Sequence, residues 1–371
     1  MKIKNVNIFN EDGYFEKGSV CMENGIFVAE SEASEGPVLD GGGLYAIPGL
    51  TDLHFHGCVG YDFCDGTEEA IRAMAAYEAS VGVVNICPAT MTLPEDQLFK
   101  ICDAAAAYRS ESGARLVGIN MEGPFISVKK KGAQNERFIR TPDIGLYQRL
   151  QERSGQRFKI VDVAPETEGA MDFISQVSKE ATVSIAHTEA DYDTAIEAFE
   201  RGASHVTHLY NAMPPYRHRA PGVIGAAADK MAAVELICDG VHIHPSVVRN
   251  TLRMFGEERV IFISDSMMAT GMPDGEYALG GQAVNVKGNR ATLADGTIAG
   301  SATNLMDCMR TAVKQMGVSL AVAVRCAAVN PAIALGIYDH YGSITPGKAA
   351  DLILLDDALE ICGIYMNGVK L

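Results

Sequence analysis

The sequence predicts an α/β fold: a (β/α)8 TIM-like barrel over residues 48–340, joined to a small discontinuous β-sandwich domain formed by residues 1–47 and 341–371. Three observations predict it. Eight apolar, strand-like runs alternate with helix-like stretches in the middle of the chain, which is typical of βα units around a parallel sheet. Short β-like runs occupy both chain ends, and polar residues gather where the central strands end.

The two chain ends have the same pattern of short apolar runs separated by turns. At the N-terminal end these runs are "KIKNVNIF", "GYFEKGSVCMENGIFVAE" and "GPVLDGGGLYAIPG". At the C-terminal end "ADLILLD" and "CGIYMNGVKL" are separated by acidic turn residues. We expect both ends to form one small β domain together.

Eight strand candidates follow in order between the ends: "AIPGLTDLHF", "VVNICPAT", "RLVGINME", "FKIVDVAP", "TVSIAH", "SHVTH", "AAVELICD" and "RVIFISD". The stretches between them predict helices, for example "TEEAIRAMAAYEASVG" and "DYDTAIEAFERGA". Each of these two has a threonine or aspartate near its start and a glycine at its end. Eight units in this order indicate a closed barrel.

The composition narrows the class of protein. Apolar residues make up 47% and charged residues 21%, which is typical of a globular chain. A net charge of −16 argues against a nucleic acid or an anionic membrane surface as partner, because both need a basic footprint. No run has membrane-spanning length, the first residues lack the apolar run of a secretory signal, and we expect a cytoplasmic protein.

Nine cysteines are scattered along the chain without a C-x-x-C pair. An odd number of cysteines without paired spacing indicates free, reduced thiols rather than a disulfide framework. A zinc site made from a cysteine cluster is therefore not expected.

Six polar side chains stand at the carboxyl ends of the predicted strands. They are His54 and His56 on the first strand, Glu122 on the third, His187 on the fifth, His208 on the sixth and Asp265 on the eighth. An H-x-H pair taken alone is more often structural than functional. Purely structural residues would be scattered over both ends of the barrel and the outer helices, whereas barrel enzymes place their chemistry at this rim.

Imidazoles and a carboxylate that converge on one rim suit a divalent metal such as zinc or ferrous iron, with a position left open for water. Such an ion lowers the pKa of the water to about 7. Asp265, on the neighbouring strand, would then accept the proton of this water and deliver it to a departing amine. That combination predicts hydrolytic chemistry.

Seven motifs carry a family resemblance over nearly the whole chain. They are "PGLTDLHFHG", "MEGPF", "AHTEA", "VTHLYNAM", "DGVHI", "ISDSM" and "GTIAGSATNLMD". With them the chain resembles the amidohydrolase superfamily and, within it, the N-acetylglucosamine-6-phosphate deacetylases. The first motif is superfamily-wide, whereas "MEGPF" with "THLYNAM" and a spacing of 21 positions from His187 to His208 is specific.

The resemblance implies a set of metal ligands. Glu122, His187 and His208 would hold the main ion, and Asp265 would be the catalytic acid and base. Some family members lack both first-strand histidines and work with one metal. His54 and His56 are present here, and we expect them to bind a second ion with Glu122 as a bridge.

The resemblance also implies substrate contacts. Asn211 and Ala212 match the stretch that meets the sugar phosphate, and Arg219 matches a phosphate-binding arginine that neighbouring subunits of the family supply, so a homodimer is expected. His242 matches a histidine that contacts substrate near the phosphate or the amide. Gln134 stands where some members carry a histidine against the sugar ring, which leaves the sugar hydroxyl contacts open.

Two further features have modest predictions of their own. The lysine run 129–131 is read as a solvated loop, with attraction of a phosphorylated substrate as the alternative. His205 lies three residues before His208, so in a strand it would point to the other face and lie buried behind the barrel wall.

The expected function is metal-dependent removal of the N-acetyl group from N-acetylglucosamine 6-phosphate, giving glucosamine 6-phosphate and acetate, as in amino-sugar catabolism or cell-wall recycling. The alternative is a related substrate, such as N-acetylgalactosamine 6-phosphate or another N-acylated amine. A non-catalytic metal-binding protein is disfavoured by the complete set of rim residues. A dinucleotide-binding oxidoreductase is disfavoured because no G-x-G-x-x-G opens a helix.

Overall fold

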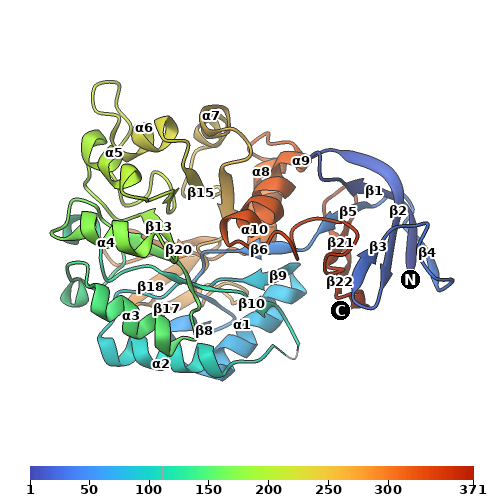
Figure 1. Cartoon of the computed structure of the whole chain (residues 1–371), viewed down its shortest axis with the longest axis horizontal. Helices are drawn as coiled ribbons and strands as arrows, with labels where there is room; N and C mark the ends of the chain where they lie inside the picture. The colour runs from blue at the N-terminus through green and yellow to red at the C-terminus, as the bar shows by residue number, and fades with distance from the viewer. Residues whose placement is uncertain (111) are drawn as a thin grey trace.

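The structure is a computed structural model that describes residues 1–110 and 112–371. Eight parallel strand positions surround the core of the larger part (Figure 1). Their strands are β6 (Leu50–Asp52), β9 (Val83–Ile86), β10 (Arg115–Leu116) with β11 (Ile119–Met121), β12 (Phe158–Val163), β13 (Thr182–Ile185), β14 (His205–Val206), β15 (Ala233–Ile237) and β16 (Val260–Ile263). The predicted barrel strands are thus confirmed in order, although the third is split into two short pieces.

Backbone contacts close the barrel. One set of strands runs β6, β9, β10 and the other runs from β11 to β16 in sequence order. A parallel bridge between Ala89 and Asn120 joins the two sets on one side. On the other side the amide of Asp265 donates to the carbonyl of His54 at 3.0 Å, which brings the ends of the first and last strands together.

Helices follow the strands and cover the barrel. They are α1 (Glu68–Ser80), α2 (Glu95–Ala107), α3 (Ile144–Arg153), α4 (Ala170–Val177), α5 (Tyr192–Glu200), α6 (Gly222–Asp229), α7 (Pro245–Phe255), α8 (Leu305–Lys314), α9 (Leu320–Val324) and α10 (Asn330–Ala334). Both helices singled out in the sequence are confirmed. Thr67 caps α1 through the amide of Ala70, and Asp191 caps α5 through the amide of Thr194.

Both chain ends contribute to a separate sheet at the right of Figure 1. Its strands are β1 (Lys2–Phe9), β2 (Phe15–Glu23), β3 (Ile26–Val28), β4 (Val38–Asp40), β5 (Tyr45–Pro48), β21 (Leu352–Leu355), β22 (Ile361–Met366) and β23 (Val369–Lys370). The central pairing joins β21 to β5 antiparallel. The strands form one continuous eight-stranded sheet, while its division into two sandwich layers and the domain boundaries at 47/48 and 340/341 stay predictions.

Residues 275–301 form a four-stranded antiparallel sheet that the sequence interpretation missed. Its strands are β17 (Gly275–Leu279), β18 (Gln282–Lys287), β19 (Arg290–Thr292) and β20 (Ile298–Ser301). Leu279 and Val284 pack against Met91 and Met267 from the barrel loops. The inserted sheet therefore lies against the loops at the carboxyl ends of the barrel strands.

Two smaller observations complete the fold. All nine cysteines are free, as the sequence predicted. Within the described part of the chain, the helices are too short or too polar to cross a membrane.

Candidate metal centre and active site

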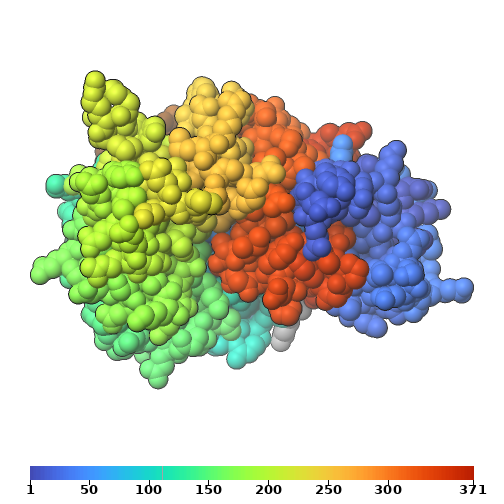
Figure 2. Space-filling view, turned by 45° about the horizontal axis from the view of Figure 1, so that its top comes forward, coloured from blue at the N-terminus to red at the C-terminus, as the bar shows by residue number. Residues whose placement is uncertain are grey.

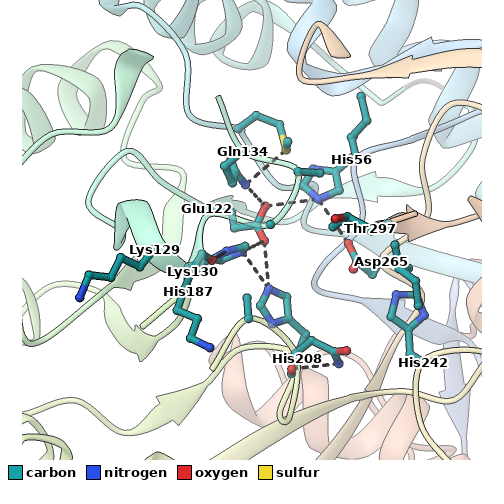
Figure 3. Close-up of a pocket in the computed structure, with 18 residues that line it drawn as sticks. His56, Glu122, Lys129, Lys130, Gln134, His187, His208, His242, Asp265 and Thr297 are labelled. Carbon is teal, nitrogen blue, oxygen red and sulfur yellow. Dashed lines mark hydrogen bonds and ion pairs between the residues drawn. The ribbon is translucent and has the colours of Figure 1, made fainter. Parts of the chain in front are cut away.

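A cavity of about 360 Å3 opens at the carboxyl ends of the barrel strands. Five of the six predicted rim residues line it, and the sixth, His54, lies buried directly behind them. The five are His56, Glu122, His187, His208 and Asp265, and Figure 3 shows them converging from different strands. The sequence-predicted rim is therefore one site.

The backbone turns sharply where three of these residues leave their strands. His187, His208 and Asp265 have φ angles of +43°, +29° and +49°, a left-handed region that non-glycine residues rarely occupy. Such strain persists only where the surrounding structure imposes it, and it concentrates at functional sites. Here it directs three polar side chains from strand ends into a single cavity.

The first group of converging atoms comes from Glu122, His187 and His208. Glu122 Oε1 lies 3.0 Å from His187 Nε2 and 3.2 Å from His208 Nε2, and the two nitrogens lie 3.1 Å apart. His187 Nδ1 donates to the carbonyl of Lys130 at 2.8 Å, so its Nε2 presents a lone pair to the carboxylate oxygen. The His187 nitrogen and the Glu122 oxygen thus present lone pairs to each other across 3.0 Å, an arrangement that a cation between them would stabilise.

The second group shares the same glutamate. His54 Nε2 lies 3.5 Å from Glu122 Oε1, and His56 Nε2 lies 3.3 Å from Glu122 Oε2. Asp265 Oδ1 is 3.3 Å from His56 Nε2 and 3.8 Å from His54 Nε2. His54 Nε2 is buried without a hydrogen-bond partner. Across the described residues, two sets have ligand atoms close enough to hold an ion: Glu122 with His187 and His208, and Glu122 with His54 and His56.

The charges of the site favour a cation. Burial by itself would raise the pKa of Glu122, but four surrounding imidazoles, that of His56 foremost, hold it well below its usual value. Burial would likewise raise the pKa of Asp265, but His56 and His54 lower it. Burial opposes charge on His54, yet Glu235 and Glu122 raise its pKa well above the usual value. Both cavity carboxylates are therefore anionic near neutral pH, as ligands for a divalent metal must be.

Two buried acidic residues that the sequence interpretation missed orient the histidines. Glu235 on β15 accepts a hydrogen bond from His54 Nδ1 at 2.9 Å. Asp239 Oδ2 lies 2.7 Å from His242 Nδ1, which leaves His242 Nε2 for the cavity. Both acids stand within the apolar run "AVELICD", and a charged residue in a buried strand is the signal that could have found Glu235.

Four of the five predicted substrate residues line the cavity: Asn211, Ala212, His242 and Gln134. The amide of Gln134 is engaged by the protein, since Nε2 donates to Glu122 Oε2 at 2.6 Å and Oε1 accepts from the Thr92 amide at 2.7 Å. Gln134 therefore also orients Glu122, and its contact with a sugar ring stays a prediction.

Arg219 does not line this cavity. It lies in the loop before α6, which stands out from the body of the molecule in Figures 1 and 2. Its guanidinium contacts His218 at 2.7 Å and borders a separate hollow beside the start of α5. Within the described chain, the cavity and this arginine belong to different surfaces.

The lysine run divides into different roles. Lys129 Nζ pairs with Glu189 at 2.9 Å, and Lys131 Nζ pairs with Glu136 at 3.0 Å. Both pairs are exposed, as expected for a solvated loop. Lys130 lines the cavity, and its ammonium has no ion pair with the residues that the structure describes.

His205 is buried, and its Nε2 lies 3.1 Å from Glu235 Oε1. The prediction that His205 sits behind the barrel wall, away from the ligand set, is confirmed. Met91, Leu279 and Ile298 give the cavity an apolar wall.

The family model of the amidohydrolase family matches residues 45–368. This match spans the barrel, the inserted sheet and strands β5, β21 and β22 of the small sheet. The chain belongs to the amidohydrolase family.

Within that family, full-length relatives are sugar-phosphate deacetylases. The chain is 35% identical to an N-acetylglucosamine-6-phosphate deacetylase of Bacillus subtilis, with 99% of this chain and 96% of the relative covered. It is 32% identical to an N-acetylgalactosamine-6-phosphate deacetylase of Escherichia coli O157:H7, with 97% and 96% covered. The resemblance predicted from the motifs is confirmed.

A solved structure agrees with this relation. A mutant of N-acetyl-D-glucosamine-6-phosphate deacetylase from Mycobacterium smegmatis, in complex with N-acetyl-D-glucosamine-6-phosphate, superimposes with a TM-score of 0.91. The two sequences are 30% identical, and the comparison covers 100% of this chain and 98% of that one.

Proposed function

We propose that this protein hydrolyses the acetamide of N-acetylglucosamine 6-phosphate and releases acetate and glucosamine 6-phosphate. One observation carries the proposal. Glu122, His187 and His208 converge to within 3.2 Å of one another, and Asp265 faces the same cavity of an amidohydrolase barrel. Full-length similarity to deacetylases of this substrate supports the choice of reaction.

We assign the main metal to Glu122, His187 and His208, and a second ion to His54 and His56 with Glu122 shared. Zinc and ferrous iron both suit this mixture of imidazoles and carboxylate. A divalent ion held there supplies Lewis acidity, which makes water more acidic and polarises an acyl oxygen.

Asp265 carries the proton. Its carboxylate lies 3.3 Å from His56 Nε2 and lines the cavity, while its backbone is hydrogen-bonded to His54 on one side and to Ser301 on the other. It accepts the proton of the attacking water and then donates it to the sugar nitrogen as the carbon–nitrogen bond breaks. An amine leaves far more readily when it is protonated, so this transfer completes the hydrolysis.

The remaining cavity residues bind the sugar phosphate. Lys130 and His242 supply positive charge or hydrogen-bond donors for the phosphate. Because the chain as a whole is acidic, this positive charge must be concentrated at the site. Asn211 and Ala212 border the same side of the cavity as His208. The apolar wall at Met91 receives the acetyl methyl group.

We further propose a homodimer in which Arg219 reaches the cavity of the partner subunit. The support is its position on a projecting loop outside its own cavity. A guanidinium fork suits a phosphate dianion. We place the enzyme in the cytoplasm, because its nine free thiols suit a reducing compartment.

N-acetylgalactosamine 6-phosphate is the second candidate substrate, because a relative of nearly full coverage is named for it. The test compares kcat/KM for three substrates: N-acetylglucosamine 6-phosphate, its epimer N-acetylgalactosamine 6-phosphate, and unphosphorylated N-acetylglucosamine. Preference for N-acetylglucosamine 6-phosphate supports the proposal. Preference for the epimer selects the alternative, and equal rates with and without phosphate contradict both.

A further inference from the structure

Glu235 lies in the middle of β15 with its side chain fully buried beneath the metal groups. A carboxylate at such a position is costly unless it is compensated by hydrogen bonds. It makes three. Oε2 accepts from His54 Nδ1 at 2.9 Å and from the amide of His208 at 3.0 Å, while Oε1 lies 3.1 Å from His205 Nε2.

The contact with His54 fixes which nitrogen of the ring faces the cavity. A carboxylate accepts only, so His54 Nδ1 carries a proton, and in the neutral ring Nε2 then presents a lone pair. That Nε2 is the buried atom without a hydrogen-bond partner, 3.5 Å from Glu122 Oε1. Carboxylates that orient a metal-binding histidine in this way commonly stand behind the ligands of metal sites.

The contact with His208 acts on the other metal group. The backbone of His208 has a φ of +29°, which is strained for a residue with a side chain. The same Oε2 atom that orients His54 also accepts the amide hydrogen of this residue. One buried oxygen is thus hydrogen-bonded to a residue of each proposed metal group.

We infer that Glu235 is a positioning residue that couples the two metal groups, by fixing the ring of His54 and the strained backbone of His208 through one carboxylate oxygen. The inference rests on the proposed metal centre. It predicts that removing the carboxylate loosens ion binding at His54 and His56 first, because that ring has lost its orientation. His187 keeps its own anchor at the Lys130 carbonyl.

The test counts bound ions directly, with zinc as the probe. Wild type, Glu235→Leu, Glu235→Gln and the control Glu78→Leu are stripped with a chelator and dialysed against buffered zinc. Glu78 is an equally buried glutamate without a hydrogen-bond partner for either oxygen, so its replacement matches the burial and the change of side-chain shape without touching a histidine.

We expect two ions per chain in wild type and in Glu78→Leu. Glu235→Leu should retain one ion and bind the second at least ~100-fold more weakly, while Glu235→Gln, which keeps one acceptor oxygen, should weaken it by ~10-fold. Retention of the first ion shows that Glu235→Leu is folded. If Glu235→Leu does not fold, the affinity of Glu235→Gln for the second ion tests the inference instead.

Three results would overturn the inference: a wild type that binds a single ion, a Glu235→Leu variant with wild-type affinity for both ions, or equal losses in Glu235→Leu and Glu78→Leu. Acetate release is not a readout here. Failure of the proposed reaction and failure of this inference therefore give different results.

Discussion

Glu122 is the residue on which the site depends most. Its Oε1 atom faces His187 and His208, while its Oε2 atom is 3.3 Å from His56 and accepts from Gln134. A buried carboxylate needs several partners to offset the loss of water. The histidines among those partners are also the side chains that a metal would join, so the packing of one residue fixes the geometry of both metal groups.

Asp265→Asn should separate chemistry from metal binding. The amide cannot accept the proton of water, so we expect kcat to fall by about 10²–10⁴-fold. The ion at Glu122, His187 and His208 should remain, because Asp265 is not among these ligands. Steady-state kinetics with metal analysis of the same preparation measures both, and near-normal turnover in metal-replete protein would contradict the assigned role.

Lys130→Ala should weaken binding of the phosphate. Loss of a charge-assisted contact raises KM for the phosphorylated sugar by roughly tenfold or more and changes kcat little. Lys129→Ala is the matched control, because that neighbouring ammonium pairs with Glu189 instead. Equal effects of the two substitutions would show that Lys130 acts only through general charge.

At this scale the sequence predicted which side chains converge at the rim, because each of them stands at a strand end. It did not predict which buried residues hydrogen-bond to these side chains and orient them. Glu235 was missed because its contact with His54 joins two strands that are far apart in the sequence. Asp239 was missed because its contact with His242 depends on the turn that follows β15. Arg219 was expected at the phosphate from resemblance, and the structure of one chain places it elsewhere.

Among the elements, α1 carries a buried ionisable group against the barrel. Burial raises the pKa of Glu78 well above its usual value, and the neighbouring Asp52 raises it further. The folded protein therefore keeps this proton at pH values where the unfolded chain, with a pKa of about 4.3, releases it. The stability from this group is full below about pH 4 and is lost as the pH rises toward the folded-state pKa.

Glu78→Gln removes that dependence because the amide does not titrate. We expect the free energy of unfolding of the variant, relative to wild type, to increase between pH 5 and pH 8 by up to about 1.4 kcal/mol per pH unit. Urea unfolding of both metal-free proteins at each pH measures it. A difference that is the same at both pH values would contradict the assignment.

The barrel elements were predictable because continuous apolar runs indicate buried parallel strands. The inserted sheet was not, because its strands are short, glycine-rich at their ends and half exposed. In β18 the residues alternate between exposed and buried, a period of two that was present in "QAVNVK" and went unused. Its buried face packs at the barrel mouth, so this missed element belongs to the site.

For the whole molecule, the proposal is that an acidic protein binds an anionic substrate through positive charge from its own cavity and from Arg219 of the partner subunit. Mixing two inactive variants tests this arrangement. In a mixed dimer of Arg219→Ala with Asp265→Asn, the site that keeps Asp265 receives an intact Arg219 from its partner. Random reassociation should restore about a quarter of wild-type activity, since half of the dimers are mixed and each has one complete site. No recovery after confirmed subunit exchange would place Arg219 outside the partner's site.

The most direct test of the account is acetate release from N-acetylglucosamine 6-phosphate by protein stripped of metal and reloaded with zinc or ferrous iron. The account predicts no turnover in the stripped protein, recovery on reloading, and a much slower reaction with the unphosphorylated sugar. An unchanged rate in fully stripped protein, or no release under either loading, would contradict it.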